Sequence, residues 1–318
     1  MKKWIFASVL LIILAVLAAC GSAEESTDSQ TAEAQTTEAE TMTVTHELGE
    51  TEVPKNPQKV VVFDFGILDT LDKLGVESIV GVPQGNVPSY LEKFEDADKY
   101  ENVGTLKEAD FETIHAMDPD LIIISGRQAE MYNEFNDIAP TIHLGVDTSD
   151  YMNSFTTNMT TVGEIFGEEA QVEEALAAIN EQIEGVQAKT KTTEGKGLIV
   201  LANEGKVSAY GAASRFGIIH DVFGVKQADE GIELSTHGQS ISYEYILDTN
   251  PDMMFVVDRN AAVGNDASAS DTLENELVQK TNAYKNEKII YLDPDYWYLS
   301  GGGLQSVSEM VTAIESAL

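Results

Sequence analysis

Two sets of short apolar runs, each alternating with helical patterns, constrain the fold of this chain most strongly. The first set comprises residues 60–63, 79–82, 121–125 and 142–144, and the second comprises residues 198–202, 207–210, 253–257 and 289–292. Alternating strands and helices predict parallel strands with helices packed on the faces of the sheet. We therefore expect an α/β fold of two Rossmann-like lobes, with the first lobe in residues 43–150 and the second in residues 192–318.

A long helical pattern, residues 151–191, separates the two sets of strands. Its apolar residues recur at the i, i+4 and i+7 spacing of one helix face. Gly163 and Gly167 interrupt the pattern near its middle. A helix of this length extends ~30 Å or more at 1.5 Å per residue. The segment is therefore expected to join the two lobes as a strut.

The N-terminus has the pattern of an export signal. Two lysines precede fourteen uncharged residues, 4–17, and the run ends with Leu-Ala-Ala before Cys20, the only Cys of the chain. The run is too short for a membrane span of ~20 apolar residues. A plain secretory signal with a chance or buried thiol is the alternative. The ending resembles the lipobox of bacterial lipoproteins, which implies removal of residues 1–19 and a diacylglycerol thioether on Cys20.

The segment after Cys20 has a composition that does not support a folded structure. Residues 21–42 contain six acids and no base, Pro or aromatic residue. Such a segment buries too little apolar surface to offset the entropy cost of ordering, so residues 20–42 are expected to form a disordered acidic tether. With the lipid, this tether would hold the folded body at the extracellular face of the cytoplasmic membrane.

The charge of the chain excludes several functions. It has 54 Asp and Glu against 19 Lys and Arg, and a net charge of -35. Such a chain repels phosphates, so we expect no nucleic-acid partner. One Cys cannot form an internal disulfide or a Cys-rich metal site. The bases themselves are biased, because 16 are Lys and only three are Arg: Arg127, Arg215 and Arg259.

The three arginines occupy related places in the predicted fold. Arg127 and Arg259 follow the carboxyl ends of predicted strands, and Arg215 lies in a strand-to-helix loop, where a helix N-terminus favours anions. Ligands of open α/β sheets bind outside the carboxyl ends of the strands. Although surface salt bridges are the usual role of Arg in an acidic protein, the planar guanidinium suits recognition of oxygen anions. We therefore predict one anionic-ligand site lined by all three.

An internal repeat with an offset of 132 residues relates residues 111–121 to residues 243–253. Each copy is predicted to contain a helix with Glu in its first turn, an Asp/Asn-Pro-Asp turn and a buried strand. Glu112 and Glu244 are equivalent in the two copies. Acids in a first turn suit the helix dipole, so helix capping and solvation are one interpretation of this pair.

Together, these features resemble the iron–siderophore/cobalamin class of ABC-transporter substrate-binding proteins over residues 43–318. The resemblance implies the class III periplasmic-binding-protein fold, in which a single long helix joins two lobes that move little on binding. It also implies a binding protein and not an enzyme. In that class one Glu on each lobe docks on basic residues of the permease, and those positions match Glu112 and Glu244.

The arginine segments look like the petrobactin/catecholate-binding lipoproteins of Gram-positive bacilli. The matching segments are Ser125-Gly126-Arg127, Ala213-Ser214-Arg215-Phe216-Gly217, Val257-Asp258-Arg259-Asn260, 216–225 and 236–244. The resemblance implies an arginine triangle that binds a ferric catecholate-type, petrobactin-like siderophore. Such a complex is trianionic and already wraps its iron, so no intrinsic cofactor and no metal ligand from the protein are expected. The implied partners are the siderophore, an ABC permease with its ATPase, and the membrane through Cys20, with the protein a monomer.

Three further residues are candidates for ligand contact. Trp297 follows the last predicted strand and Tyr210 ends another, and both present aromatic rings that suit catechol rings. Gln84 lies in a polar loop after the strand at 79–82. Core packing or turn formation would explain each of them equally well.

Other functions fit the sequence less well. The five histidines are scattered, whereas a zinc or manganese site needs a convergent set of ligands. Haem is a closer alternative, but its two propionates would leave the third Arg unexplained. An extracellular α/β enzyme is also an alternative, although the sequence has no Gly-x-Gly-x-x-Gly, phosphate-loop or Gly-x-Ser-x-Gly motif in the required context. An adhesin would not need three arginines at strand ends.

Overall fold

The computed structural model describes residues 40–265, 267–273 and 275–318. The predicted signal peptide 1–19, Cys20 and the tether up to residue 39 lie outside the described residues. Strand β1 (Thr41–His46) begins within the last residues assigned to the tether and forms an antiparallel hairpin with β2 (Gly49–Pro54).

The first lobe contains a five-stranded sheet in the order β5-β4-β3-β6-β7, and all of its strand pairs are parallel. Its strands are β3 (Val60–Val62), β4 (Ile79–Val82), β5 (Glu101–Asn102), β6 (Leu121–Ile124) and β7 (Thr141–His143). Every residue of β3 and β6 is buried, as expected for central parallel strands that are covered on both faces. The parallel arrangement predicted from the sequence is confirmed in this sheet.

The second lobe contains a six-stranded sheet in the order β11-β9-β8-β12-β13, with β10 also paired to β8. Its strands are β8 (Lys196–Asn203), β9 (Lys206–Tyr210), β10 (Lys226–Gln227), β11 (Gln239–Ile241), β12 (Met253–Asp258) and β13 (Ile289–Leu292). Here the structure differs from the expected parallel arrangement, since β9 is antiparallel to both β8 and β11. Only Glu204 and Gly205 connect β8 to β9, and both have positive φ, as in a tight hairpin turn.

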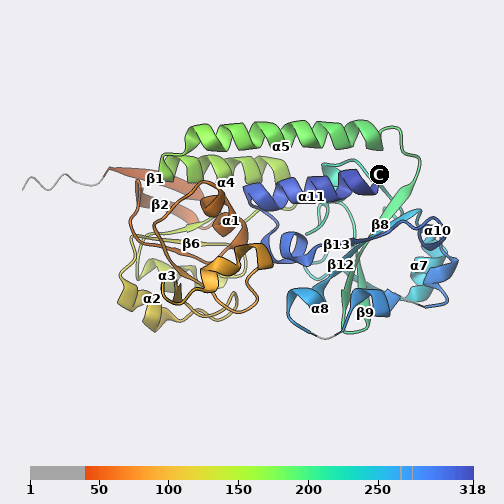
Figure 1. The fold of residues 1–318 in the computed structure, drawn as a ribbon, viewed down its shortest axis with the longest axis horizontal. Coiled ribbons are helices and arrows are strands. Elements are labelled where there is room, and N and C mark those ends of the chain that lie inside the picture. The colour runs from red at the N-terminus through yellow and green to blue at the C-terminus, as the bar shows by residue number, and fades with distance from the viewer. Residues whose placement is uncertain (1–39, 266, 274) are drawn as a thin grey trace, which may run out of the picture. The chain divides into compact units, whose positions relative to one another are not determined.

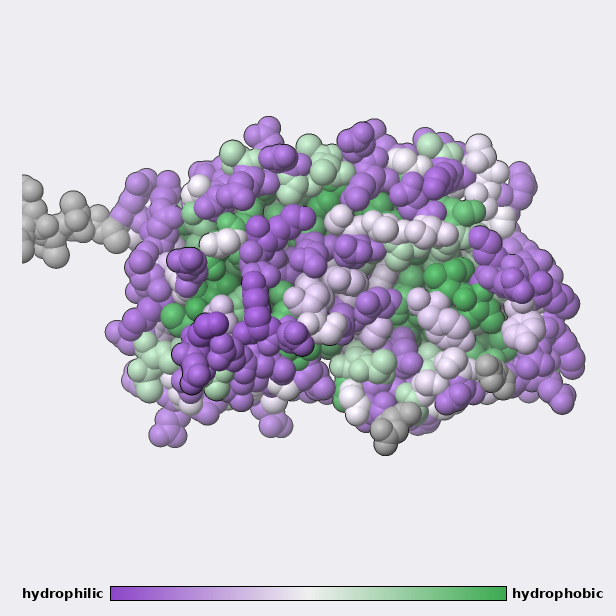
Figure 2. Space-filling view, in the orientation of Figure 1, coloured by the Kyte–Doolittle hydropathy of each residue, from purple (hydrophilic) through white to green (hydrophobic). Residues whose placement is uncertain are grey.

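The segment predicted as one connecting helix, 151–191, contains two helices. Helix α4 (Tyr151–Phe166) ends at Gly167, whose φ of 71° places it in the left-handed region, and α5 (Glu169–Thr190) follows. Helix α5 extends along α4 and then along the C-terminal helix α11 (Leu304–Ala317), as Figure 1 shows. The outward residues of α5 include Glu173, Glu174 and Glu181, and hydrophilic residues are frequent along this edge of the surface (Figure 2).

The remaining helices are short. They are α1 (Phe65–Lys73), α2 (Phe111–Met117), α3 (Tyr132–Asn136), α6 (Ile218–Asp221), α7 (Tyr243–Thr249), α8 (Arg259–Ala262), α9 (Ala269–Leu273) and α10 (Asn282–Lys285). Short 3-10 helices occur at Ser89–Glu95, Ala129–Met131 and Val278–Lys280, and a π-helical turn, η4, spans Asp295–Ser300.

One apolar core extends through both lobes. It includes Phe65 of the first lobe, Phe155 of α4, Ile183 of α5, Phe255 of the second lobe and Ile314 of α11, all of which are buried. Two smaller apolar clusters each belong to one lobe. The lobes are therefore joined by packed side chains as well as by the connecting chain.

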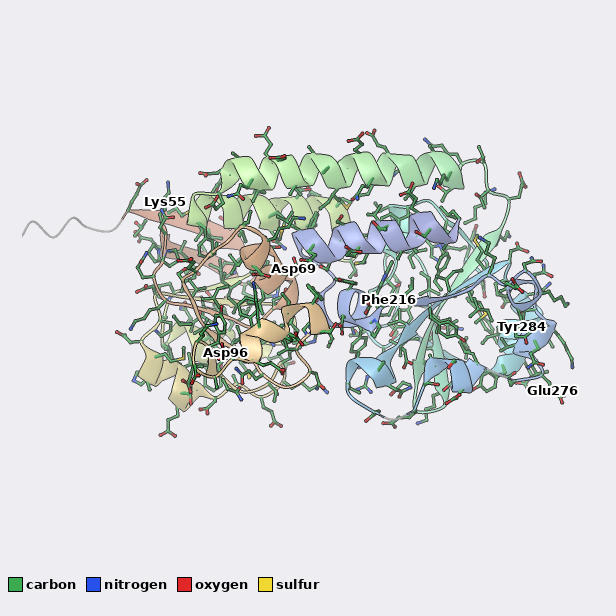
Figure 3. All side chains as sticks on the ribbon, in the orientation of Figure 1. Lys55, Asp69, Asp96, Phe216, Glu276 and Tyr284 are labelled. Atoms are coloured by element: carbon green, nitrogen blue, oxygen red, sulfur yellow. The ribbon has the colours of Figure 1, made fainter. Side chains whose placement is uncertain are left out.

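Helices α1 and α11 meet at a buried carboxylate, Asp69, which is labelled in Figure 3. Its Oδ1 accepts a hydrogen bond from the Gln305 backbone N–H at 3.2 Å, and its Oδ2 accepts one from Ser306 N–H at 3.0 Å. The adjacent Thr70 hydroxyl accepts from Leu304 N–H at 3.0 Å. Residues of the first lobe thus satisfy the free N–H groups at the start of α11, where the helix dipole also favours a carboxylate.

Candidate functional site

A cleft of about 1210 Å³ receives wall residues from both lobes. The first lobe contributes residues at or after the carboxyl ends of β6 and β7, namely Ser125–Arg127 and His143–Val146. The second lobe contributes Arg259 at the end of β12 and residues of η4, which follows β13. The cleft therefore lies where the sequence predicted a ligand site, outside the carboxyl ends of parallel strands.

Strand β9 contributes one of its faces to the cleft. The alternate residues Lys206, Ser208 and Tyr210 line it, as expected for side chains on one side of a strand. Because β9 is antiparallel to β8, Tyr210 lies opposite Ile199 and not beside the carboxyl end of β8. Tyr210 thus reaches the cleft in a different way from that predicted.

The structure brings the three arginines together around Tyr298. Arg127 and Arg215 both donate from Nη2 to the Tyr298 carbonyl oxygen, at 3.2 and 2.5 Å. Arg259 donates from Nε to the Tyr298 hydroxyl oxygen at 3.0 Å and from Nη1 to Asn203 Oδ1 at 2.9 Å. One residue of η4 therefore holds guanidinium groups from both lobes.

Aromatic rings enclose the Arg215 guanidinium. Its central carbon lies 4.2 Å from the ring centre of Tyr298 and 5.4 Å from that of Phe216, which is labelled in Figure 3. Burial lowers the pKa of Arg215, and the charge of Arg127 lowers it further. Burial alone would raise the pKa of Tyr298, but the charges of Arg215 and Arg259 outweigh it and lower that pKa. Negative charge is therefore favoured at this end of the cleft.

No carboxylate neutralises the three arginines within the part of the chain that the structure describes. The ion pairs found there involve only lysines and His143. The arginine partners are a carbonyl oxygen, a hydroxyl and an amide oxygen, all uncharged acceptors. Arg127 is exposed and Arg215 and Arg259 are half-buried. Their positive charges are therefore open to the cleft without a counter-ion, which suits an anionic ligand.

The other predicted contact residues divide between the cleft and its surroundings. Trp297 and Tyr210 line the cleft and are each 3% exposed. Gln84 is not among the cleft-lining residues, and its side-chain amide instead donates to the Phe94 carbonyl oxygen at 3.2 Å. The structure therefore places Gln84 in a loop contact.

Tyr298 is the central residue of the site and was not predicted. It belongs to the aromatic run at 296–298, from which only Trp297 was selected. The available signal was the position of this run, directly after the carboxyl end of β13. Tyr296, two residues earlier, instead packs its ring 4.6 Å from that of Tyr90. The η4 turn therefore directs Tyr296 toward Tyr90 and Tyr298 toward the arginines.

The first-lobe wall of the cleft contains a buried histidine close to a carboxylate. His143 is 6% exposed, and its Nδ1 lies 3.7 Å from a Glu47 carboxylate oxygen. Burial lowers the pKa of His143, while the charges of Glu47 and Asp64 act in the opposite direction. Within residues 40–318, omitting 266 and 274, no group of three or more His, Cys, Asp and Glu is placed to hold a metal ion.

Glu112 and Glu244 lie away from the cleft, in the first turns of α2 and α7, and both are exposed. The two helices are built alike. Asp110 and Ser242 cap their N-termini, and both helices end at a residue with positive φ, Asp118 and Asn250 respectively.

The Pro-Asp part of the repeat has a structural role. Asp120 Oδ2 accepts from Lys59 N–H at 2.9 Å, and Asp252 Oδ2 accepts from Lys196 N–H at 3.0 Å. Each aspartate therefore fixes the start of the strand paired with its own, β3 in one lobe and β8 in the other. The internal repeat predicted from the sequence is thus also present in three dimensions.

Comparison with known proteins places the chain among binding proteins. Residues 60–296 match the periplasmic binding protein family. The petrobactin-binding protein YclQ of Bacillus subtilis is 51% identical, covering 100% of this chain and 99% of its own length. Its crystal structure matches with a TM-score of 0.85 over 87% of this chain and 98% of that chain. The catecholate-siderophore binding protein VctP of Vibrio cholerae matches at 35% identity, with a TM-score of 0.83 over 87% of this chain and 100% of that chain. These matches confirm the expected fold class and the resemblance.

No helix among the described residues combines the length and the apolar character that crossing a bilayer requires.

Proposed function

The chain belongs to the periplasmic binding protein family, and from this premise we propose that it captures a ferric catecholate-type siderophore in the cleft and delivers it to an ABC permease for iron uptake. The relatives described above are named for binding petrobactin or a catecholate siderophore. Their names support this ligand class for a cleft of the same fold.

The observation that carries the proposal is the set of three guanidinium groups, from both lobes, that share Tyr298 and whose acceptors in the described part of the chain are uncharged. A hexadentate ferric complex of two catecholates and a third dianionic chelating group is a compact trianion, so three positive charges match its charge. The siderophore supplies the oxygen ligands of its iron. The protein would then contribute charge, shape and aromatic surface, and it would need no intrinsic cofactor and no catalytic step.

The residues have separate roles in this proposal. Arg127, Arg215 and Arg259 attract and orient the anion. Trp297 and Tyr210 are nearly buried in the cleft wall, so only a small part of each ring is left for contact with the ligand. Glu112 and Glu244 dock the two lobes on basic residues of the permease, which works with its ATPase. Both glutamates are exposed and lie outside the cleft, which leaves them accessible while ligand is bound.

The division of the chain follows from the same proposal. Residues 1–19 act as a lipoprotein signal, Cys20 carries the lipid, and the tether ends before Thr41, where strand β1 begins. Residues 43–150 and 192–318 form the lobes that the helical segment 151–191 connects. The protein works as a monomer at the extracellular face of the cytoplasmic membrane.

Fluorescence titration of the purified protein with ferric catecholates, ferric hydroxamates and haem tests the ligand class. We expect the ferric catecholates to bind most tightly. Arg215→Ala should weaken their binding at least tenfold, because a hydrogen bond to a charged group contributes ~1.5–3 kcal/mol. Lys191→Ala, which removes one exposed positive charge outside the cleft, is the control and should bind normally. Unchanged affinity in Arg215→Ala would remove Arg215 from the site, and tighter binding of haem would favour haem as the ligand.

A further inference from the structure

Leu234 is an exposed leucine on the wall of the cleft. Its side chain is 67% exposed, and the other large hydrophobic residues that are exposed in the described part of the chain, Tyr284 and Tyr291, lie outside the cleft. Removing a Leu side chain from water is favourable. A leucine left open beside a ligand site is therefore able to gain free energy when a ligand covers it.

The loop that carries Leu234 is fixed on both sides. Before Leu234, Asp229 accepts from the Tyr245 hydroxyl at 2.6 Å, and Ile232 packs on the apolar cluster of the second lobe. Glu233 N–H then donates to Gln239 Oε1 at 2.8 Å, and Gly238 N–H donates to the Ser235 carbonyl oxygen at 3.0 Å. These contacts hold the backbone on both sides of Leu234, whose exposed side chain lines the cleft.

The backbone after Leu234 is also held closely. Gly238 has φ of 73°, and a Cβ at this position would lie 2.6 Å from a ring carbon of Tyr210. The loop thus returns to β11 over the ring of a cleft residue. Leu234, Ser235, Thr236 and His237 all line the cleft as a result.

We propose that Leu234 is a specificity-determining residue that packs on an aromatic ring of the bound ferric siderophore. This inference rests on the proposed function. In a ferric catecholate the oxygens face the iron and the arginines, so the hydrocarbon edges of the rings point outward. An exposed leucine stabilises such an edge by excluding water from it. Citrate-type chelates present carboxylates or hydroxyls there and gain nothing from Leu234.

The test compares two probes on the purified full-length protein: ferric 3,4-dihydroxybenzoate, and ferric citrate, an anionic chelate without an aromatic ring. We expect Leu234→Ser to weaken binding of the aromatic probe about fivefold, and Leu234→Phe to retain it. Binding of ferric citrate should be the same in all variants. Tyr284→Ser removes exposed apolar surface outside the cleft (Tyr284 is labelled in Figure 3) and should change neither affinity.

The possible failures are distinguishable. If the wild type binds ferric dihydroxybenzoate and Leu234→Ser binds it equally well, the inference is overturned and the proposed function stands. Equal weakening of both probes would make Leu234 a general wall residue and would also overturn it. A wild type that binds no ferric catecholate would overturn both proposals. Thermal unfolding of each variant should match the wild type, because Leu234 is outside the core.

Discussion

At the residue scale, the arginines could be found from the sequence because they are rare. Three Arg among 19 basic residues, each near a strand end, form a signal that does not depend on knowing any side-chain direction. Tyr298 gave no comparable signal. It is one of 11 tyrosines, and only the turn η4 determines that it, and not Tyr296, contacts the arginines. Gln84 shows the same limit, since its loop was visible in the sequence but its hydrogen bond to Phe94 was not.

The buried carboxyl group of Asp69 is expected to make the stability of the protein depend on pH. Burial raises its pKa from 3.8 to about 6, although hydrogen bonds from Ser306, Gln305 and Tyr90 oppose the rise. Because this pKa is higher in the folded protein than in the unfolded chain, the protonated carboxyl favours the folded state. Its contribution to the free energy of unfolding is fully present below pH 3.8 and is lost as the pH rises through about 6.

We therefore expect Asp69 to lower the free energy of unfolding as the pH rises from 3.8 to about 6, with a slope of at most about 1.4 kcal/mol per pH unit. Asp69→Asn cannot ionise and should lack this slope. Urea unfolding at several pH values measures it, and Asp137→Asn, which changes an exposed acid, should keep it. Parallel pH profiles for the wild type and Asp69→Asn would contradict the prediction.

At the element scale, apolar runs located four strands of each sheet, but they missed the short strands β5, β10 and β11 and carried no information on strand direction. The run at 207–210 looks like any other buried strand, and only the two-residue connection at 204–205 makes it antiparallel to β8. A crossover to a parallel strand needs a dozen or more residues. Likewise, the apolar pattern at 151–191 continued across Gly167. Gly167 has a left-handed backbone conformation that ends α4, and a second helix, α5, follows.

The glycines before α11 allow α1 and α11 to approach closely. A Cβ on Gly303 would lie 2.1 Å from Asp69 Oδ1 and from the Gly66 carbonyl oxygen. We expect Gly303→Ala to lower the free energy of unfolding by about 3 kcal/mol or more, because backbone and a buried carboxylate would both have to move. The control is Gly185→Ala in α5, where a Cβ meets nothing within 4 Å. It should stabilise the protein by about 0.5–1 kcal/mol through helix propensity. Urea unfolding distinguishes the two, and equal stability of Gly303→Ala and the wild type would contradict the close approach.

At the scale of the whole molecule, a net charge of -35 is compatible with binding an anionic ligand, because the surface acids and the arginines act over different distances. Salt screens exposed charges beyond ~8–10 Å. The arginines act at contact distance, in a part of the cleft where no described carboxylate pairs with them. The acids on the outer surface are then free for another purpose, such as solubility or contact with a basic partner.

The positions of Glu112 and Glu244 predict which part of the outer surface contacts the permease. They occupy equivalent places on two lobes that share one packed core, so their separation is fixed by the fold and not by a flexible connection. Two acids at a fixed separation suit docking on two basic sites, and losing both removes the electrostatic contact from each lobe. We expect Glu112→Ala combined with Glu244→Ala to leave the affinity for ferric siderophore unchanged and to abolish uptake of labelled iron by cells.

The matched control for this docking pair changes the net charge equally at other positions. Glu173→Ala combined with Glu181→Ala removes two exposed acids from the outer face of α5. This variant should bind and transport like the wild type. If it lost transport to the same extent, net charge and not position would be responsible. If the Glu112 and Glu244 variant lost ligand binding, its effect would lie in the cleft, and the docking role would be wrong.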